Sequence, residues 1–185
     1  MKKSHVALMF LALAAPLASL AAPVQPSAPN APKFIKSIQA PGGIDVRYVD
    51  FKWDAEAFAT IEKGGSHPVG RRSWVLARVL LQDAPVKWNG RTLPVGPFLL
   101  ILHPSRGGTA PTLEMRKVDL REVFRDPDVV AEPLDGETYQ TAPANFRKVD
   151  TLAPRLELSV QDKPGALDLT VHYGDRQTVV TLQRR

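Results

Sequence analysis

Alternation of apolar and polar residues with a period of two is the feature that most restricts the fold of this chain. Between residues 167 and 173 every second residue is apolar, and similar alternation occupies 156–161 and 112–118. Successive side chains of a β-strand point to opposite faces of its sheet, so the pattern predicts strands with one buried face. Further strands are predicted at 44–51, 86–88, 91–93, 98–102, 146–151 and 176–183.

Residues 73–81 are apolar on both sides of the strand that they predict, and Arg78 is their only charge. Such a strand is typical of the centre of a sheet, where both faces are covered. Short strands with turn signals between them, and no alternation of strands with helices, predict a mainly β protein. We expect an antiparallel β-sandwich or an open barrel, with one or two short helices in the connections.

Glycine-containing pairs and triplets mark the tight turns. Asn89-Gly90 separates two short strands, and both central residues of a type I′ turn need a positive φ, which Asn and Gly tolerate best. This pair therefore predicts a hairpin. Turns at 163–165 and at Gly174-Asp175 would make the last three strands an antiparallel meander.

Two segments have helical signals. Asp54 is placed to cap a helix over 55–63, which Gly64 and Gly65 would end. Residues 119–126 carry an apolar stripe and predict a second short helix before Pro127. The proline-containing stretch 127–143 is predicted to be a long loop.

The first 21 residues have the order of a secretory signal. Lys2 and Lys3 precede a short apolar run, and small residues lead to a predicted cleavage after Ala21. Residues 22–40 are predicted to be a proline-rich lead and 41–185 a single β-rich domain. The sequence therefore predicts a periplasmic or secreted protein with no integral membrane span once the signal is removed.

Charge and cysteine content exclude several classes of function. The formal net charge is +5, and removal of the two signal lysines leaves +3, too small a bias for a nucleic-acid binder. The chain has no cysteine, so it has no thiol nucleophile and no disulfide.

Two stretches resemble a known family. NGRTLPVGPFLLILHP followed by TLEMRKVD, and GALDLTVHYGDRQTVVTL near the end, are similar to the secreted bacterial family called domain of unknown function 2911. The resemblance spans about residues 72–183, with the middle loop unmatched. It implies an exported β-rich domain and little chemistry. A Trp-Arg-x-Gly-Ala-Asn stretch associated with that family is replaced here by GRRSWVLARVLLQ, so no site built on that stretch carries over.

Histidine is the obvious candidate for chemistry, and His67, His103 and His172 lie outside the signal. Three imidazoles can hold zinc, but no two of them have the local spacing of a metal motif, so no metal or other cofactor is expected. No Gly-x-Ser-x-Gly stretch is present either, and no catalytic residue is assigned.

Two basic loops are the better candidates for binding. His67, Arg71 and Arg72 belong to GGSHPVGRR, and His103 and Arg106 belong to HPSRGG. Arginine holds a carboxylate or phosphate through two parallel hydrogen bonds, so the loops would form a basic pocket if they met at one end of the sandwich. Trp88, beside the hairpin turn, is a candidate for stacking on a sugar ring.

The sequence thus predicts an exported, non-enzymatic module that binds an anionic or glycan ligand or an envelope protein. One alternative is a hydrolase or metal-dependent enzyme that uses the loop histidines. Another is an envelope assembly factor that offers a free sheet edge to a partner.

Overall fold

The fold consists of two antiparallel sheets and one short helix. The computed structural model describes residues 35–121 and 136–184, within a unit that begins at Pro32. The six-stranded sheet has the order β1 (Ile35–Ala40), β2 (Ile44–Val49), β3 (Trp74–Leu81), β6 (Gly96–His103), β7 (Thr112–Lys117) and β8 (Glu137–Pro143). The four-stranded sheet has the order β5 (Arg91–Leu93), β4 (Val86–Trp88), β10 (Ala166–Arg184) and β9 (Arg147–Lys163).

One hydrophobic core joins the two sheets. It takes Trp74, Leu100 and Leu113 from the larger sheet, and Leu156 and Leu169 from the smaller one. Leu113, Leu156 and Leu169 come from the apolar positions of alternating strands, and β3, which is apolar on both sides, lies inside its sheet between β2 and β6. The predicted sandwich of antiparallel strands is therefore confirmed, and the described strands do not close into a barrel.

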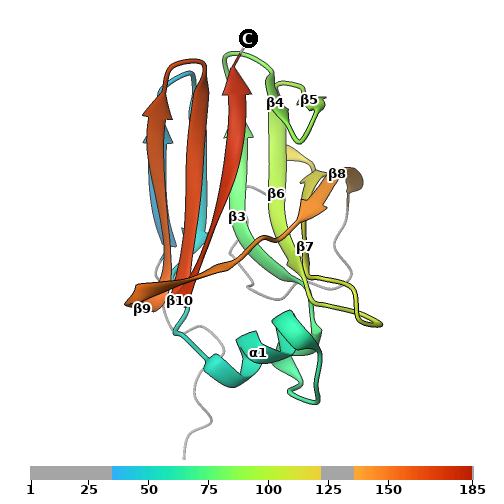
Figure 1. The fold of residues 1–185 in the computed structure, drawn as a ribbon. Coiled ribbons are helices and arrows are strands. Elements are labelled where there is room, and N and C mark those ends of the chain that lie inside the picture. Colours follow the sequence, from blue (N-terminus) through green and yellow to red (C-terminus); the bar gives the residue numbers. More distant parts are fainter. Residues whose placement is uncertain (1–34, 122–135, 185) are drawn as a thin grey trace, which may run out of the picture. The chain divides into compact units, whose positions relative to one another are not determined.

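Helix α1 (Ala55–Lys63) covers one end of the two sheets (Figure 1). Asp54 caps it by accepting a 2.9 Å hydrogen bond from the Ala57 amide, and Gly64 ends it with a φ of 77°. Phe58 and Ile61, three residues apart, enter the core from the same face. The predicted helix over 55–63 is confirmed, and no helix in the described ranges is long and apolar enough to cross a membrane.

The predicted lead was too long at its C-terminal end. Residues 35–40, assigned to it, form β1 and pair antiparallel with β2 through Ile44 to Val49. Prolines end at Pro32 and return only at Pro41, so the composition of the lead does not extend over these six residues. The domain therefore begins before residue 41, while the predicted signal lies outside the described residues.

The predicted C-terminal meander is also wrong. Residues 147–163 form the single strand β9, and β10 runs without a turn from Ala166 to Arg184. The pair Gly174-Asp175 lies inside β10, where the register to β9 shifts on either side of Gly174. A glycine inside a strand marks an irregularity of this kind as readily as a turn.

The predicted loop over 127–143 is wrong over its last seven residues. These residues form β8, which pairs with β7 and ends at Pro143. The remainder of that loop, and most of the helix predicted over 119–126, lie outside the described residues.

The Asn89-Gly90 hairpin protects a sheet edge. Asn89 and Gly90 have φ values of 44° and 82°, as the predicted turn requires. The Asn89 side chain donates to the carbonyl of Thr141, and the Arg91 guanidinium donates to that of Tyr139 while lying 4.3 Å from the centre of its ring. Both carbonyls belong to β8, the last strand of its sheet, so the hairpin occupies bonding positions that an edge strand would otherwise offer.

We expect Arg91→Ala to lower the free energy of unfolding by about 1 kcal/mol, because it removes an exposed cation–π contact and a hydrogen bond to an edge carbonyl. The change should also speed backbone hydrogen exchange in residues 137–143, measured by mass spectrometry. Lys87→Ala on the exposed side of β4 is the control and should leave that exchange unchanged. Equal exchange in both variants would contradict a protective role for the hairpin.

Candidate ligand-binding site

A pocket of about 370 Å³ lies where the end of α1 meets the loop between β6 and β7. We call it the anion pocket. Its walls are formed by Thr60, Gly64, Gly65, Arg71, Pro104, Ser105, Arg106 and Gly107. Residues of both basic loops line it, so the condition set for a basic pocket is met, and the Ser105 amide bonds the second loop to the helix by donating to the Ile61 carbonyl at 2.8 Å.

Close packing fixes the wall that carries Arg71. Arg71 ends the 3₁₀ turn η1 (Val69–Arg71), whose Gly70 lies against α1. A Cβ on Gly70 would be 2.2 Å from the Ala57 carbonyl oxygen and 2.6 Å from the Thr60 Cβ, so only glycine permits this approach. The Trp74 indole also donates to the Val69 carbonyl at 3.0 Å. The backbone that leads into Arg71 is therefore held on two sides.

The opposite wall is a turn with its own hydrogen bonds. The Thr109 hydroxyl donates to the Arg106 carbonyl at 2.7 Å, and the Ser105 hydroxyl donates to the Thr109 carbonyl. Gly107 and Gly108 adopt positive φ values of 58° and 82°, which let the chain turn this tightly. Pro104, with its fixed φ, connects this turn to the end of β6.

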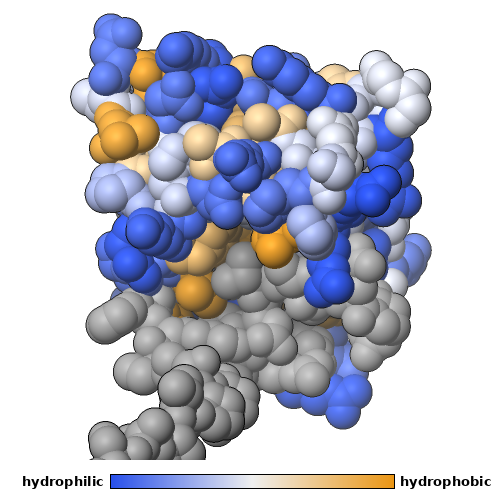
Figure 2. Space-filling model, turned by 90° about the horizontal axis from the view of Figure 1, so that it is seen from below, coloured by the Kyte–Doolittle hydropathy of each residue, from blue (hydrophilic) through white to orange (hydrophobic). Residues whose placement is uncertain are grey.

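The charges of the anion pocket favour a negative ligand. Arg71 and Arg106 line it, and none of its lining residues is acidic. The carbonyl end of α1 would oppose an anion, but the carbonyls of Thr60 and Ile61 already accept hydrogen bonds from Gly64 and Ser105. Figure 2 views the molecule from this end, and its coloured surface consists of hydrophilic residues around a few apolar ones.

Some predicted binding residues lie outside the anion pocket. Arg72 is exposed, and His67 lies with its Nε2 3.8 Å from an Asp54 carboxylate oxygen. Neither residue lines the walls. His103, at the end of β6 and next to Pro104, does not line the walls either.

The prediction for Trp88 is wrong. Trp88 is only 5% exposed and belongs to the core, so its ring is not available for stacking at the surface. Val86 and Trp88 point inward and Lys87 outward, as the period of a strand requires. Whether a residue of this strand is exposed depends on which face of the sheet its side chain points to, and not on how close it is to the turn.

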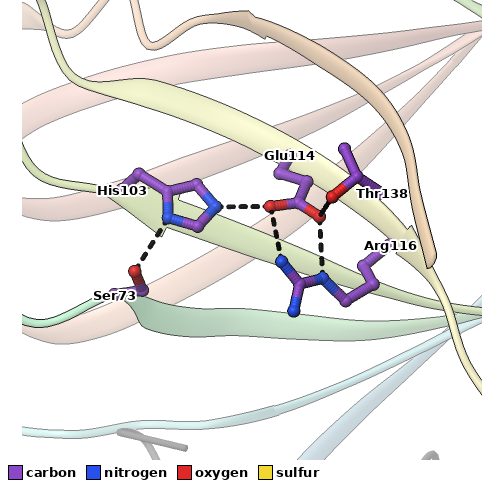
Figure 3. Close-up of polar contacts among 5 residues, drawn as sticks. All are labelled: Ser73, His103, Glu114, Arg116 and Thr138. Atoms are coloured by element: carbon purple, nitrogen blue, oxygen red, sulfur yellow. Dashed lines mark hydrogen bonds and ion pairs between the residues drawn. The ribbon is translucent and has the colours of Figure 1, made fainter. Parts of the chain in front are cut away.

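A network of five polar side chains lies beside the anion pocket, and we call it the Glu114 network (Figure 3). Its members are Ser73, His103, Glu114, Arg116 and Thr138. Ser73 Oγ is 2.8 Å from His103 Nδ1, and His103 Nε2 is 2.5 Å from Glu114 Oε2. These side chains connect the ends of β3 and β6 with β7 and β8.

Glu114 is the centre of this network. Its side chain is 4% exposed, and it accepts from Arg116 Nε at 2.7 Å, from Arg116 Nη2 at 3.1 Å and from Thr138 Oγ1 at 2.7 Å. Burial by itself would raise the pKa of Glu114. Hydrogen bonds from His103, Arg116 and Thr138, with the charge of Arg116, outweigh burial and lower that pKa to about 2.

Glu114 and Ser73 hold the two ring nitrogens of His103. An ionised carboxylate only accepts hydrogen bonds, so His103 Nε2 donates to Glu114, while Nδ1 is hydrogen-bonded to the Ser73 hydroxyl. Each ring nitrogen therefore has its own partner, and the imidazole plane is held from both sides.

The order serine, histidine, carboxylate is also that of a hydrolytic triad. Two observations favour a positioning role instead. Ser73 is only 5% exposed and does not line the anion pocket. Glu114 also forms a double hydrogen bond with Arg116, which ties the carboxylate into the sheet.

Sequence reasoning missed Ser73, Glu114, Arg116 and Thr138. Glu114 stands between Leu113 and Met115 in an alternating strand, and that pattern alone predicts a solvent-facing carboxylate. Its burial depends on partners from two other strands, His103 of β6 and Thr138 of β8, which no local spacing reveals. Within the described ranges no three metal-ligating side chains come together, so the loop histidines gain no support as a metal site.

No protein family, curated protein or solved structure matches the chain. The resemblance to domain of unknown function 2911 therefore stays a prediction, and function has to be argued from the site.

Proposed function

We propose that this protein is a non-enzymatic binding module that holds a small anionic ligand between Arg71 and Arg106. The observation that carries the proposal is that two loops distant in sequence bring one arginine each to the same pocket, with no carboxylate on its walls. A cavity of about 370 Å³ is large enough for an anionic group attached to a further small moiety.

The chemistry of the walls fits phosphate or carboxylate groups. A guanidinium presents paired N–H donors that match two oxygens of such a group, and it stays charged at any physiological pH. Gly64, Gly65 and Gly107 let a ligand approach the backbone closely. An anionic group on an envelope glycan has this chemistry.

Export would place the site in the cell envelope or outside the cell. The signal-like residues 1–21 support that location, and cleavage after Ala21 remains our expectation. The alternative of an assembly factor would need a sheet edge other than the part of β8 whose two carbonyls the hairpin already occupies, and β1, β5 and β9 are the other outer strands.

We expect Arg71→Gln and Arg106→Gln each to weaken binding of an anion roughly tenfold, the loss of one charge-assisted hydrogen bond. Isothermal titration at constant ionic strength would measure it, with inorganic phosphate, citrate and a sugar phosphate as probes. The two substitutions together should abolish measurable binding, because the pocket then has no positive charge on its walls.

Arg72→Gln is the matched control. It removes the same charge from the neighbouring position, and Arg72 is exposed without lining the anion pocket. Its effect should stay within about twofold, since an exposed charge outside the site acts only through screened attraction. Equal losses from Arg71→Gln and Arg72→Gln, or no binding of any of the three probes at millimolar concentration, would contradict the proposal.

A further inference from the structure

We propose that the hydrogen bond between Ser73 and His103 links the two walls of the anion pocket and, together with the contacts of both walls to α1, sets the separation of Arg71 and Arg106. The inference rests on the proposed function, and it makes Ser73 and His103 positioning residues. Neither touches the ligand; they act through the arginines on the same two segments.

The link joins the two walls next to the arginines. Ser73 follows Arg71 by two residues and immediately precedes β3, and His103 precedes Arg106 by three residues and ends β6. The 2.8 Å contact between Ser73 Oγ and His103 Nδ1 connects the segments where they leave the sheet. It lies one position beyond the last paired residues of these strands, Trp74 and Leu102.

The chain between the Ser73–His103 bond and the two arginines is restrained. Loss of that bond should therefore alter the positions of Arg71 and Arg106 in the pocket. On one side Arg72 is extended and η1 is packed against α1 through Gly70. On the other side Pro104 has a fixed φ, and Ser105 is bonded to the Ile61 carbonyl. Both arginines are thus connected to the Ser73–His103 link through short, restrained segments.

Glu114 holds the imidazole for this task. It accepts from Nε2 and so keeps Nδ1 directed at Ser73. The two ring nitrogens therefore have separable functions: Nδ1 links the walls, and Nε2 connects the link to the sheet. If the Glu114 network only stabilised the fold, loss of the Nδ1 bond and loss of the Nε2 bond would not differ in their effect on ligand binding.

Two substitutions at His103 test this separation. The amide of asparagine reaches the position of Nδ1, so His103→Asn should keep the bond to Ser73 and lose that to Glu114. The longer glutamine reaches the position of Nε2, so His103→Gln should keep Glu114 and lose Ser73. Ser73→Ala removes the same bond from the other side.

The first measurement is titration of each full-length variant with inorganic phosphate. We expect Ser73→Ala and His103→Gln to weaken binding roughly five- to tenfold, which is about 1–1.4 kcal/mol. His103→Asn should stay within about twofold of the parent. Equal affinities in all four proteins, or a larger loss in His103→Asn than in His103→Gln, would overturn the proposal. The proposal would also be overturned if the loss of phosphate affinity in each variant were proportional to its loss of unfolding free energy, measured in urea.

The second measurement needs no ligand and separates the two proposals. In Ser73→Ala and in His103→Gln, backbone hydrogen exchange should become faster in both segments, 64–72 and 104–109. In His103→Asn it should be unchanged in both. That pattern supports the link even if the parent protein fails to bind phosphate, in which case the proposed ligand chemistry alone is wrong. Unchanged exchange in Ser73→Ala overturns the link whatever the affinities are.

Discussion

Gly174→Ala is expected to lower the free energy of unfolding by about 3 kcal/mol. Gly174 has a φ of 63°, a conformation that costs an alanine about 1 kcal/mol. A Cβ at this position would also lie 2.2 Å from two ring carbons of Trp53, so the indole has to move, and overpacking of this kind costs about 1–3 kcal/mol. In a domain of this size the midpoint of thermal unfolding should fall by roughly 10 °C.

Trp53 has little room to move. Its ring is 4.6 Å from that of Tyr173 and 5.3 Å from that of Phe58, and its amide donates to the Pro154 carbonyl. Urea unfolding followed by tryptophan fluorescence would measure the effect.

Gly165→Ala is the matched control for Gly174→Ala. Gly165 has a similar φ of 72°, but no atom lies within 4 Å of the Cβ it would gain. It should therefore show the conformational cost of about 1 kcal/mol without the clash. If the two alanine variants were equally stable, close contact between Trp53 and the β10 backbone would be refuted.

The same glycine illustrates where sequence reasoning fails. Gly174-Asp175 has the local signature of a turn, and the sequence predicted one. In the structure the glycine instead lets Trp53 pack on a continuous strand, and Trp53 is far from it in sequence. Local signals were sufficient for α1 and for the Asn89-Gly90 hairpin, because caps and positive φ values are properties of a few consecutive residues.

For the candidate site, the sequence could indicate which loops to compare. The two basic loops were singled out by their arginines and glycines, and the sandwich brings Arg71 and Arg106 to one pocket. The depth of Trp88 and the burial of Glu114 were not predictable in this way. Both depend on which face of a strand is covered and on which neighbouring strands cover it. The pairing of the whole sheet decides this, and no short stretch of sequence does.

Glu114→Gln should lower the free energy of unfolding by about 3 kcal/mol at pH 7. The pKa of Glu114 is lowered from 4.5 to about 2 in the folded protein, and each unit of such a shift corresponds to about 1.4 kcal/mol. Removal of the carboxylate also takes from Arg116, whose side chain is largely buried, its double hydrogen bond with Glu114.

The pH dependence distinguishes this origin from a packing defect. A lowered folded-state pKa means that the unfolded chain binds a proton more readily, so the stabilisation by Glu114 is complete above about pH 4.5 and is lost as the pH falls towards 2. Urea unfolding at pH 7, 4.5 and 2.5 should show the parent protein and Glu114→Gln converging over that interval. Glu157→Gln on the exposed side of β9 should differ from the parent by less than about 0.5 kcal/mol throughout. A gap between the parent and Glu114→Gln that stayed constant from pH 7 to pH 2.5 would mean that shape, and not the ionised carboxylate, stabilises this part of the sheet.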